Sequence, residues 1–264
     1  MSVLGAIVDR KKGEVARLKA RLPETTIREL LTSAPPVREF KASLQASEGP
    51  AIIAEVKRAS PSKGVLCPDQ SPVDFDPIAI AKAYEANGAR ALSILTDTHY
   101  FWGSEDVLGA CREAVALPVL RKEFIVDAYQ VAHSRWLGAD AILLLARCLS
   151  QSEIQEFAGE ALQLGMDVLI EIHHQEELER ALCVPEALVG INHRDLSTLE
   201  MHSDRALELM TQIPDDRLVV GESGIRSAAD IQRLQAGGIH TFLIGSHLVV
   251  SGDPGGALAA LLPA

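Results

Sequence analysis

The sequence predicts a closed (β/α)₈ barrel preceded by a helical extension. From residue 51 onward, short apolar runs alternate with helical patterns, and the connections between them are short. Glycine follows many of the predicted helices directly before the next apolar run, as in Leu137-Gly138-Ala139, where it supplies a left-handed backbone. The other architecture considered is an open doubly wound sheet, which usually carries a G-x-G-x-x-G turn after its first strand. No such turn is present, so the repeat of strand and helix favours closure into a barrel.

The predicted elements follow one another without an intervening linker. An amphipathic helix occupies residues 2–20 and ends before Pro23, and a second short helix and a segment around Phe40 lie within residues 24–48. The predicted strands are 51–56, 91–95, 117–120, 140–145, 167–172, 187–191, 218–221 and 240–244. The predicted helices that follow them are 77–87, 104–115, 127–137, 150–164, 174–183, 203–212, 226–236 and 254–262. We therefore expect residues 1–48 to form an extension that packs on a single-domain barrel of residues 49–264.

Composition narrows the class of function. The 264 residues are 47% hydrophobic but only 4% aromatic, which suits aliphatic parallel strands covered by helices. The net charge of −11 argues against a nucleic-acid partner, since neutralising phosphates requires a basic face. No signal peptide or membrane-spanning run is visible, and the cysteines are scattered, which indicates a reduced, cytoplasmic protein without a membrane partner. We further expect a monomer with at most weak self-association.

Polar residues stand where the predicted strands end, and in such a barrel these ends form the active site. Glu55 and Lys57 end the first strand and lie on one face, because they are two residues apart. The later strands end in Arg121-Lys122-Glu123, Glu171 with His173, Asn192-His193-Arg194-Asp195, Glu222-Ser223-Gly224 and Gly245-Ser246. For any one of these residues a structural ion network is an equally good interpretation. A whole ring of costly charges at one mouth favours function.

The last two loops indicate a phosphate site. Gly221-Glu222-Ser223-Gly224-Ile225 and Leu243-Ile244-Gly245-Ser246 each lead from a strand into a helix. Glycine-rich turns of this kind present backbone N–H groups to an anion, and these two loops are the usual phosphate site of such barrels. The glycines would also serve a tight turn alone. Two such turns in adjacent loops, each with serine, favour a phosphorylated substrate.

Six sequence blocks resemble the indole-3-glycerol-phosphate synthase family of tryptophan biosynthesis. They are IIAEVKRASPSKG (52–64), LRKEF (120–124), LIEIH (169–173), GINHRDL (190–196), GESGI (221–225) and LIGS (243–246). The resemblance covers nearly the whole chain. The chain departs from the usual family pattern at Glu123, His193, Gly221 and His247, and none of these departures removes a matched catalytic position.

The resemblance implies a reaction without cofactor or metal. The substrate is 1-(2-carboxyphenylamino)-1-deoxyribulose 5-phosphate, an anionic sugar phosphate that carries an anthranilate ring, and the products are indole-3-glycerol phosphate, CO₂ and water. Lys122 then resembles the general acid, and we expect burial and neighbouring cations to lower its pKa. Glu171 matches the base of the dehydration step. The catalytic residues implied are Lys122, Glu171, Glu55, Lys57, Asn192 and Ser223; which of the two lysines acts in which step stays open.

The substrate-binding residues follow from the same resemblance. The phosphate is expected on Gly224, Gly245 and Ser246, and the ring carboxylate near Lys57 and Ser60. Arg194 is expected to bind the polyhydroxyl chain or the ring end of the substrate, and Glu222 is a further expected substrate-binding residue. An apolar slot for the aromatic ring is expected from Phe101, Phe124, Pro61 and Leu143. Residues 60–64 are expected to form a mobile loop whose Lys63 closes over the substrate.

Other functions stay open at this point. Glu171 and His173 form a plausible ligand pair for a metal-dependent aldolase or epimerase, but further ligands are missing at neighbouring strand ends. Lys122 would serve a Schiff-base aldolase. A phosphoribosyl-anthranilate isomerase would share the phosphate loops, but no cysteine ends the first strand. A non-catalytic sugar-phosphate binder or scaffold is the candidate from outside the enzymes.

Overall fold

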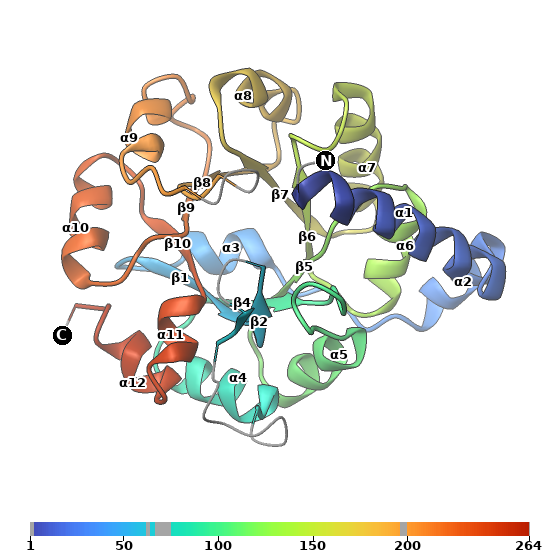
Figure 1. The fold of residues 1–264 in the computed structure, drawn as a ribbon, viewed down its shortest axis with the longest axis horizontal. Coiled ribbons are helices and arrows are strands. Elements are labelled where there is room, and N and C mark those ends of the chain that lie inside the picture. Colours follow the sequence, from blue (N-terminus) through green and yellow to red (C-terminus); the bar gives the residue numbers. More distant parts are fainter. Residues whose placement is uncertain (1–2, 62–63, 67–74, 196–199, 264) are drawn as a thin grey trace.

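Eight parallel strands close into a barrel, as the sequence predicts (Figure 1). The structure is a computed structural model that describes residues 3–61, 64–66, 75–195 and 200–263. Around the barrel the strands follow the order β1-β10-β9-β8-β7-β6-β5-β4. They are β1 (Ala51–Val56), β4 (Ala91–Leu95), β5 (Val119–Lys122), β6 (Ala141–Leu145), β7 (Asp167–Ile172), β8 (Leu188–Asn192), β9 (Val219–Glu222) and β10 (Thr241–Ile244).

A helix follows each barrel strand, and these helices form the outer ring in Figure 1. They are α4 (Pro77–Ala86), α5 (Glu105–Ala114), α6 (Tyr129–Trp136), α7 (Gln151–Gln163), α8 (Gln175–Leu182), α9 (Arg205–Met210), α10 (Ala228–Ala236) and, after β10, α11 (Ser246–Val250) with α12 (Pro254–Ala259). Left-handed glycines end several of them as predicted: φ is 94° at Gly88, 90° at Gly138, 81° at Gly165 and 90° at Gly238.

The predicted bounds of the third barrel strand are wrong by two residues. The prediction was 117–120, but β5 runs from Val119 to Lys122. Proline has no N–H for the strand ladder, so the strand begins after Pro118. Arg121 and Lys122 therefore belong to the strand itself, and their side chains point to opposite faces.

The alternation of side chains along each strand builds two separate cores. One set, which includes Ile53, Leu169 and Leu243, fills the barrel interior. The other set, which includes Ile52, Ile170 and Ile244, packs between the strands and the surrounding helices. Both faces are apolar because a parallel barrel buries both. This explains why the strands appear in the sequence as continuous apolar runs.

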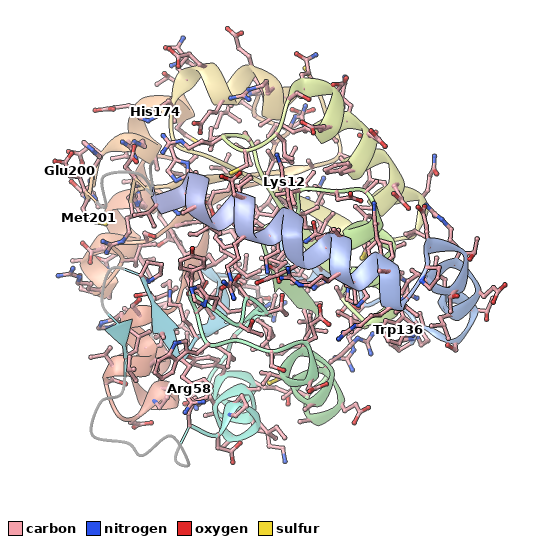
Figure 2. All side chains as sticks on the ribbon, turned by 45° about the vertical axis from the view of Figure 1, so that its right-hand side comes forward. Lys12, Arg58, Trp136, His174, Glu200 and Met201 are labelled. Atoms are coloured by element: carbon pink, nitrogen blue, oxygen red, sulfur yellow. The ribbon has the colours of Figure 1, made fainter. Side chains whose placement is uncertain are left out.

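The N-terminal extension contacts the barrel at both of its ends. Helix α1 (Val3–Arg21) lies across the molecule in Figure 2, and its Leu4 and Ile7 join the interior core. After α2 (Glu24–Leu30) and a short 3₁₀ helix (Leu31–Ser33), α3 (Phe40–Gln45) places Phe40 and Leu44 in the same core. The backbone N–H of Lys41 donates to Asp167 at the start of β7, at 2.8 Å. Helix α3 therefore closes the N-terminal end of the barrel, whereas α1 covers the other end; the domain boundary at residue 48 stays a prediction.

A two-stranded hairpin follows β1. Strands β2 (Ala59–Ser60) and β3 (Gly64–Val65) pair antiparallel, in a segment predicted only as a loop. The predicted closing residue Lys63 lies outside the described residues. Among the helices that the structure describes, none is long and apolar enough to cross a membrane.

Candidate active site

One pocket opens at the C-terminal ends of the barrel strands and encloses a cavity of about 370 Å³. Every predicted site residue within the described ranges lines it. These residues are Glu55, Lys57, Ser60, Pro61, Phe101, Lys122, Phe124, Leu143, Glu171, Asn192, Arg194, Glu222, Ser223, Gly224, Gly245 and Ser246. The barrel thus brings together strand ends that are far apart in the sequence.

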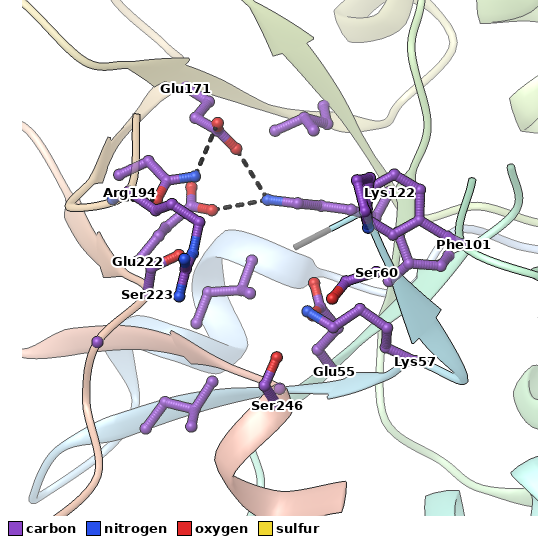
Figure 3. Close-up of a pocket in the computed structure, with 18 of the residues that line it drawn as sticks. Glu55, Lys57, Ser60, Phe101, Lys122, Glu171, Arg194, Glu222, Ser223 and Ser246 are labelled. Atoms are coloured by element: carbon purple, nitrogen blue, oxygen red, sulfur yellow. Dashed lines mark hydrogen bonds and ion pairs between the residues drawn. The ribbon is translucent and has the colours of Figure 1, made fainter. Parts of the chain in front are cut away.

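Lys122 lies between two carboxylates in the barrel interior (Figure 3). Its Nζ donates to Oε2 of Glu171 at 3.0 Å and to Oε2 of Glu222 at 2.6 Å. All three side chains are buried or nearly so. They come from β5, β7 and β9, which point them toward the barrel axis because each occupies an inward-facing position near a strand end.

The neighbours of Lys122 act on its pKa in the direction opposite to the one predicted. Burial would lower the pKa of this ammonium, but the charges of Glu171, Glu222 and Glu55 raise it well above its usual range. The expectation of a lowered pKa is therefore wrong for the substrate-free site. Of the two cations expected to lower it, Lys57 is itself paired with Glu55, and Arg58 lies over the rings of Phe75 and Trp102. Lys122 is a fully protonated ammonium at neutral pH.

The two carboxylates beside Lys122 have very different pKa values. Burial opposes the ionisation of Glu171, but Lys122, then His173 and the hydrogen bond from Asn192, lower its pKa to about 2. Burial and the charge of Glu171 instead raise the pKa of Glu222 to about 8, against the opposing effect of Lys122. Glu171 is therefore ionised at neutral pH while Glu222 largely keeps its proton. When the pKa values of two carboxyl groups in one site differ this much, one can act as a base and the other as an acid.

Glu55 and Lys57 form a second ion pair on the adjacent wall. Glu55 lies against the turn after β10, where a Cβ on Gly245 would collide with its carboxylate. A Cβ on Gly190 of β8 would likewise collide with Glu222. Glycine at these two positions leaves room for the two buried carboxylates.

Asn192 and Arg194 extend the polar wall from β8. Asn192 Nδ2 donates to Oε1 of Glu171 at 3.0 Å, and Asn192 Oδ1 accepts the backbone N–H of Arg194 at 3.0 Å. Asn192 therefore fixes one oxygen of Glu171, while the other faces Lys122. The Arg194 side chain lies beside Glu222 and Ser223 in Figure 3 and lines the pocket.

The loops after β9 and β10 turn sharply at the pocket rim. Ser223 and Gly224 both have left-handed backbones, with φ of 66° and 77°. A serine in this region is uncommon and marks a constrained turn. Gly245 and Ser246 begin α11 on the neighbouring strand end. That these turns bind the phosphate stays a prediction.

An apolar slot faces the charged groups. The rings of Phe101 and Phe124 lie 6.0 Å apart, and Pro61 and Leu143 line the same cavity. Helix α1 adds residues that the sequence reasoning missed, namely Val3, Leu4 and Ile7. Their only sequence signal is the apolar stripe of the first helix, which does not show which face of the barrel the helix covers.

Several strand-end residues lie outside the pocket. Arg121 points away from the barrel axis and is 2% exposed, with Glu105 at 2.6 Å and Ser134 at 3.1 Å. The prediction that Arg121 lies at the barrel mouth is wrong, because side chains alternate along β5 and the side chain of Lys122 is the one that faces inward. His193 is buried with Nδ1 3.0 Å from the carbonyl of Ser223, and burial lowers its pKa. Asp195 pairs with Arg147 at 3.0 Å.

A family model described as indole-3-glycerol phosphate synthase matches residues 4–261. The chain belongs to the indole-3-glycerol phosphate synthase family. It is 45% identical over 262 residues to the indole-3-glycerol phosphate synthase of Leptothrix cholodnii, covering 98% of each chain. The family resemblance given by the six sequence blocks is confirmed.

Solved structures of other proteins share the barrel with this member of the family. The 3-hexulose-6-phosphate synthase of Salmonella typhimurium aligns with a TM-score of 0.60 at 14% identity, covering 80% of this chain and 96% of that one. KGPDC from Streptococcus mutans aligns with a TM-score of 0.59 at 12% identity, covering 81% and 96%. At such identities the likeness shows the fold alone.

Glu171 and His173 do approach each other, as the metal-site hypothesis required. Within the described part of the chain, however, no group of three or more His, Cys, Asp or Glu side chains is arranged to hold a metal ion. The pocket of this synthase-family chain is instead organised around Lys122.

Proposed function

We propose that this chain catalyses the reaction of its family, the conversion of 1-(2-carboxyphenylamino)-1-deoxyribulose 5-phosphate to indole-3-glycerol phosphate, CO₂ and water. The observation that carries the proposal is the placement of Lys122 between Glu171 and Glu222, in a pocket that is also lined by the two glycine-containing turns after β9 and β10 and by an apolar slot. Each of these parts matches one part of the substrate.

The substrate is held at both ends. Gly224, Gly245 and Ser246 bind the phosphate through the turns after β9 and β10. The aromatic ring lies in the slot between Phe101 and Phe124 under α1, and its carboxylate lies near Lys57 and Ser60. Holding the ring and the phosphate at fixed positions bends the substrate, so that the ring carbon approaches the ketone carbon.

Ring closure needs an acid. The ring carbon that bears the carboxylate attacks the ketone carbon, and the ketone oxygen takes a proton as the new carbon–carbon bond forms. Lys122 carries a proton at neutral pH and points into the cavity, so it supplies this proton. The carboxylate then leaves as CO₂, and its bonding electrons return to the ring.

Dehydration needs a base as well as an acid. The hydroxyl formed in the first step takes a further proton from one of the two pocket lysines, Lys57 or a reprotonated Lys122, and leaves as water. Glu171 accepts the proton that the five-membered ring loses, and one proton from solvent balances the loss of CO₂ from a carboxylate. Glu171 is suited to this role because it is ionised and fixed by Asn192. Glu222 keeps its own proton near neutral pH, so at that pH Glu171 is the ionised partner of the Lys122 ammonium.

Indole formation in the presence of EDTA tests the proposal. The purified chain is mixed with the substrate, and indole absorbance and fluorescence are followed. We expect turnover, a fall in kcat of about 10²–10⁴-fold for Lys122→Ala, and no change for Lys12→Ala, whose side chain is exposed on α1. Substrate binding without indole formation would indicate a non-catalytic sugar-phosphate binder. Covalent trapping of the substrate by borohydride would indicate a Schiff-base enzyme.

The metal-free reaction, the cytoplasmic location, the monomeric state and the absence of a nucleic-acid partner stay predictions. The EDTA arm of the assay tests the first, and light scattering of the purified chain tests the monomer.

A further inference from the structure

His173 lies directly behind the proposed base. It follows β7, two residues after Glu171, and is 1% exposed. Its Nε2 lies 3.4 Å from Oε1 of Glu171, and its Nδ1 lies 3.5 Å from Oε2 of Glu177. Both nitrogens are sealed from solvent, and neither has a hydrogen-bond partner in the ranges that the structure describes. A buried imidazole between two carboxylates, with neither nitrogen bonded, calls for an explanation.

Glu177 is itself firmly held from the other side. It lies in the first turn of α8, where its Oε2 accepts the backbone N–H of His173 at 2.6 Å. Its Oε1 accepts from Nε of Arg147 at 3.0 Å, and Arg147 also pairs with Asp195 at 3.0 Å. A line of buried polar groups therefore runs from Glu171 through His173 to the outer face of the barrel.

We infer that His173 is a positioning residue for Glu171, holding Oε1 of that carboxylate through its Nε2–H, while its other nitrogen lies beside Glu177. This inference rests on the proposed function. In the substrate-free site, Oε1 of Glu171 faces Asn192 and His173, whereas Oε2 faces Lys122. When Lys122 turns toward the ketone oxygen of the substrate, Oε2 is released to accept a proton and Oε1 stays fixed.

The present distances fit a contact that tightens during the reaction. They exceed the usual range of an N–H···O hydrogen bond. Catalytic hydrogen bonds are often long in substrate-free structures and shorten in the complex. A partner that holds the non-reacting oxygen of a carboxylate keeps the reacting oxygen aligned. Residues that hydrogen-bond to metal ligands orient those ligands in the same way.

The pH dependence of Glu171 reflects every charged or titratable group that faces this cluster. These groups are Lys122 on β5, Glu222 on β9, Glu55 on β1, Cys148 and Arg147 after β6, His174 and Glu177 at the start of α8, and Asp195 after β8. A substitution at His173 leaves all of these side chains in place and, apart from Glu171, removes the imidazole only from beside Glu177. A change in the pH profile of such a variant therefore reports on the imidazole.

A purely structural role is the competing explanation. Glu177 accepts the His173 backbone N–H and so helps to begin α8, which would need no contribution from the imidazole. The test must separate the loss of a donor from the loss of packing. His173→Leu keeps an apolar body but has no donor, and His173→Gln restores an N–H donor at similar reach. His240→Leu, at an exposed side chain just before β10 and away from the pocket, is the matched control.

The measurement is kcat and KM against pH for the four proteins, with thermal unfolding to confirm that each is folded. For His173→Leu we expect kcat to fall about tenfold or more with KM nearly unchanged. Loss of a donor raises the pKa of Glu171, so the acidic limb of kcat moves to higher pH. His173→Gln should recover most of kcat and the position of that limb, and His240→Leu should match the wild type.

Two results would overturn the inference while leaving the proposed function intact. One is a wild-type kcat and pH profile in His173→Leu. The other is an equal loss in the Leu and Gln variants, which would show that only packing matters. A wild-type chain that forms no indole would instead reject the proposed function, and the inference with it.

Discussion

Nζ of Lys122 and Oε2 of Glu222 lie 2.6 Å apart, although 100 positions separate the two residues in the sequence. Strands β5 and β9 bring them together across the barrel interior. Burial and the nearby Glu171 raise the pKa of Glu222 to about 8, so this carboxyl group keeps its proton where an exposed glutamate has lost it.

Glu222→Gln should change how stability depends on pH. In the wild type, the folded chain holds a proton on Glu222 between about pH 4.3, the ordinary value of the group, and its raised pKa of about 8. The unfolded chain releases that proton, so the contribution of Glu222 to stability falls as pH rises through this window. Urea unfolding at several pH values should show the variant gaining stability relative to the wild type from about pH 5 to pH 8.

Glu176→Gln provides the control for that experiment, since Glu176 is exposed in the first turn of α8. Its difference from the wild type should not change over the same range. A constant difference for Glu222→Gln as well would show that Glu222 titrates like an exposed glutamate.

Lys11→Met should destabilise the contact between α1 and the barrel. The Lys11 ammonium is buried and lies 3.0 Å from Asp97 and 3.1 Å from Glu123, which follow β4 and β5. Removing it takes a cation from two buried carboxylates, of which Glu123 keeps only Arg121 at 3.8 Å, at a cost of about 3–5 kcal/mol. Chemical denaturation measures the loss.

The adjacent Lys12→Met is the matched variant, because Lys12 is exposed one residue further along α1. Its stability should stay within about 0.5 kcal/mol of the wild type. Equal stabilities of the two variants would mean that the buried ion pairs of Lys11 contribute nothing measurable.

Gly224→Ala should weaken phosphate binding. Gly224 has φ of 77°, which costs a residue with a Cβ about 1–2 kcal/mol. Relief of that strain moves the backbone out of its binding conformation, so KM for the substrate should rise about 5–30-fold. The inhibition constant of inorganic phosphate should rise in parallel.

Gly238→Ala separates strain from binding. Gly238 has φ of 90° but lies between α10 and β10, away from the pocket. It should lose stability without a change in KM or in phosphate inhibition. A similar KM for Gly224→Ala and the wild type would place the phosphate elsewhere in the pocket.

The barrel and the neighbourhood of its site could be predicted from the sequence because both depend on short-range patterns. The runs around Ile53 and Ile170 are continuously apolar because both faces of a parallel barrel are buried. Left-handed glycines such as Gly138 end helices for a local steric reason. An inward-facing residue at a strand end is placed at the mouth by the architecture alone, which is why Glu171 and Lys122 could be assigned to one pocket, whereas Arg121 on the other face of β5 could not.

Only the tertiary structure decided the properties that depend on residues far apart in the sequence. The pKa of Lys122 is raised because Glu171 and Glu222 reach it from other strands, and no local pattern contains that information. The side of the barrel that α1 covers, and thus the place of Leu4 in the pocket, depends on packing between elements. Periodicity fixes which face of a strand or helix is buried, whereas charge interactions and docking depend on separations in space that only the closed barrel sets.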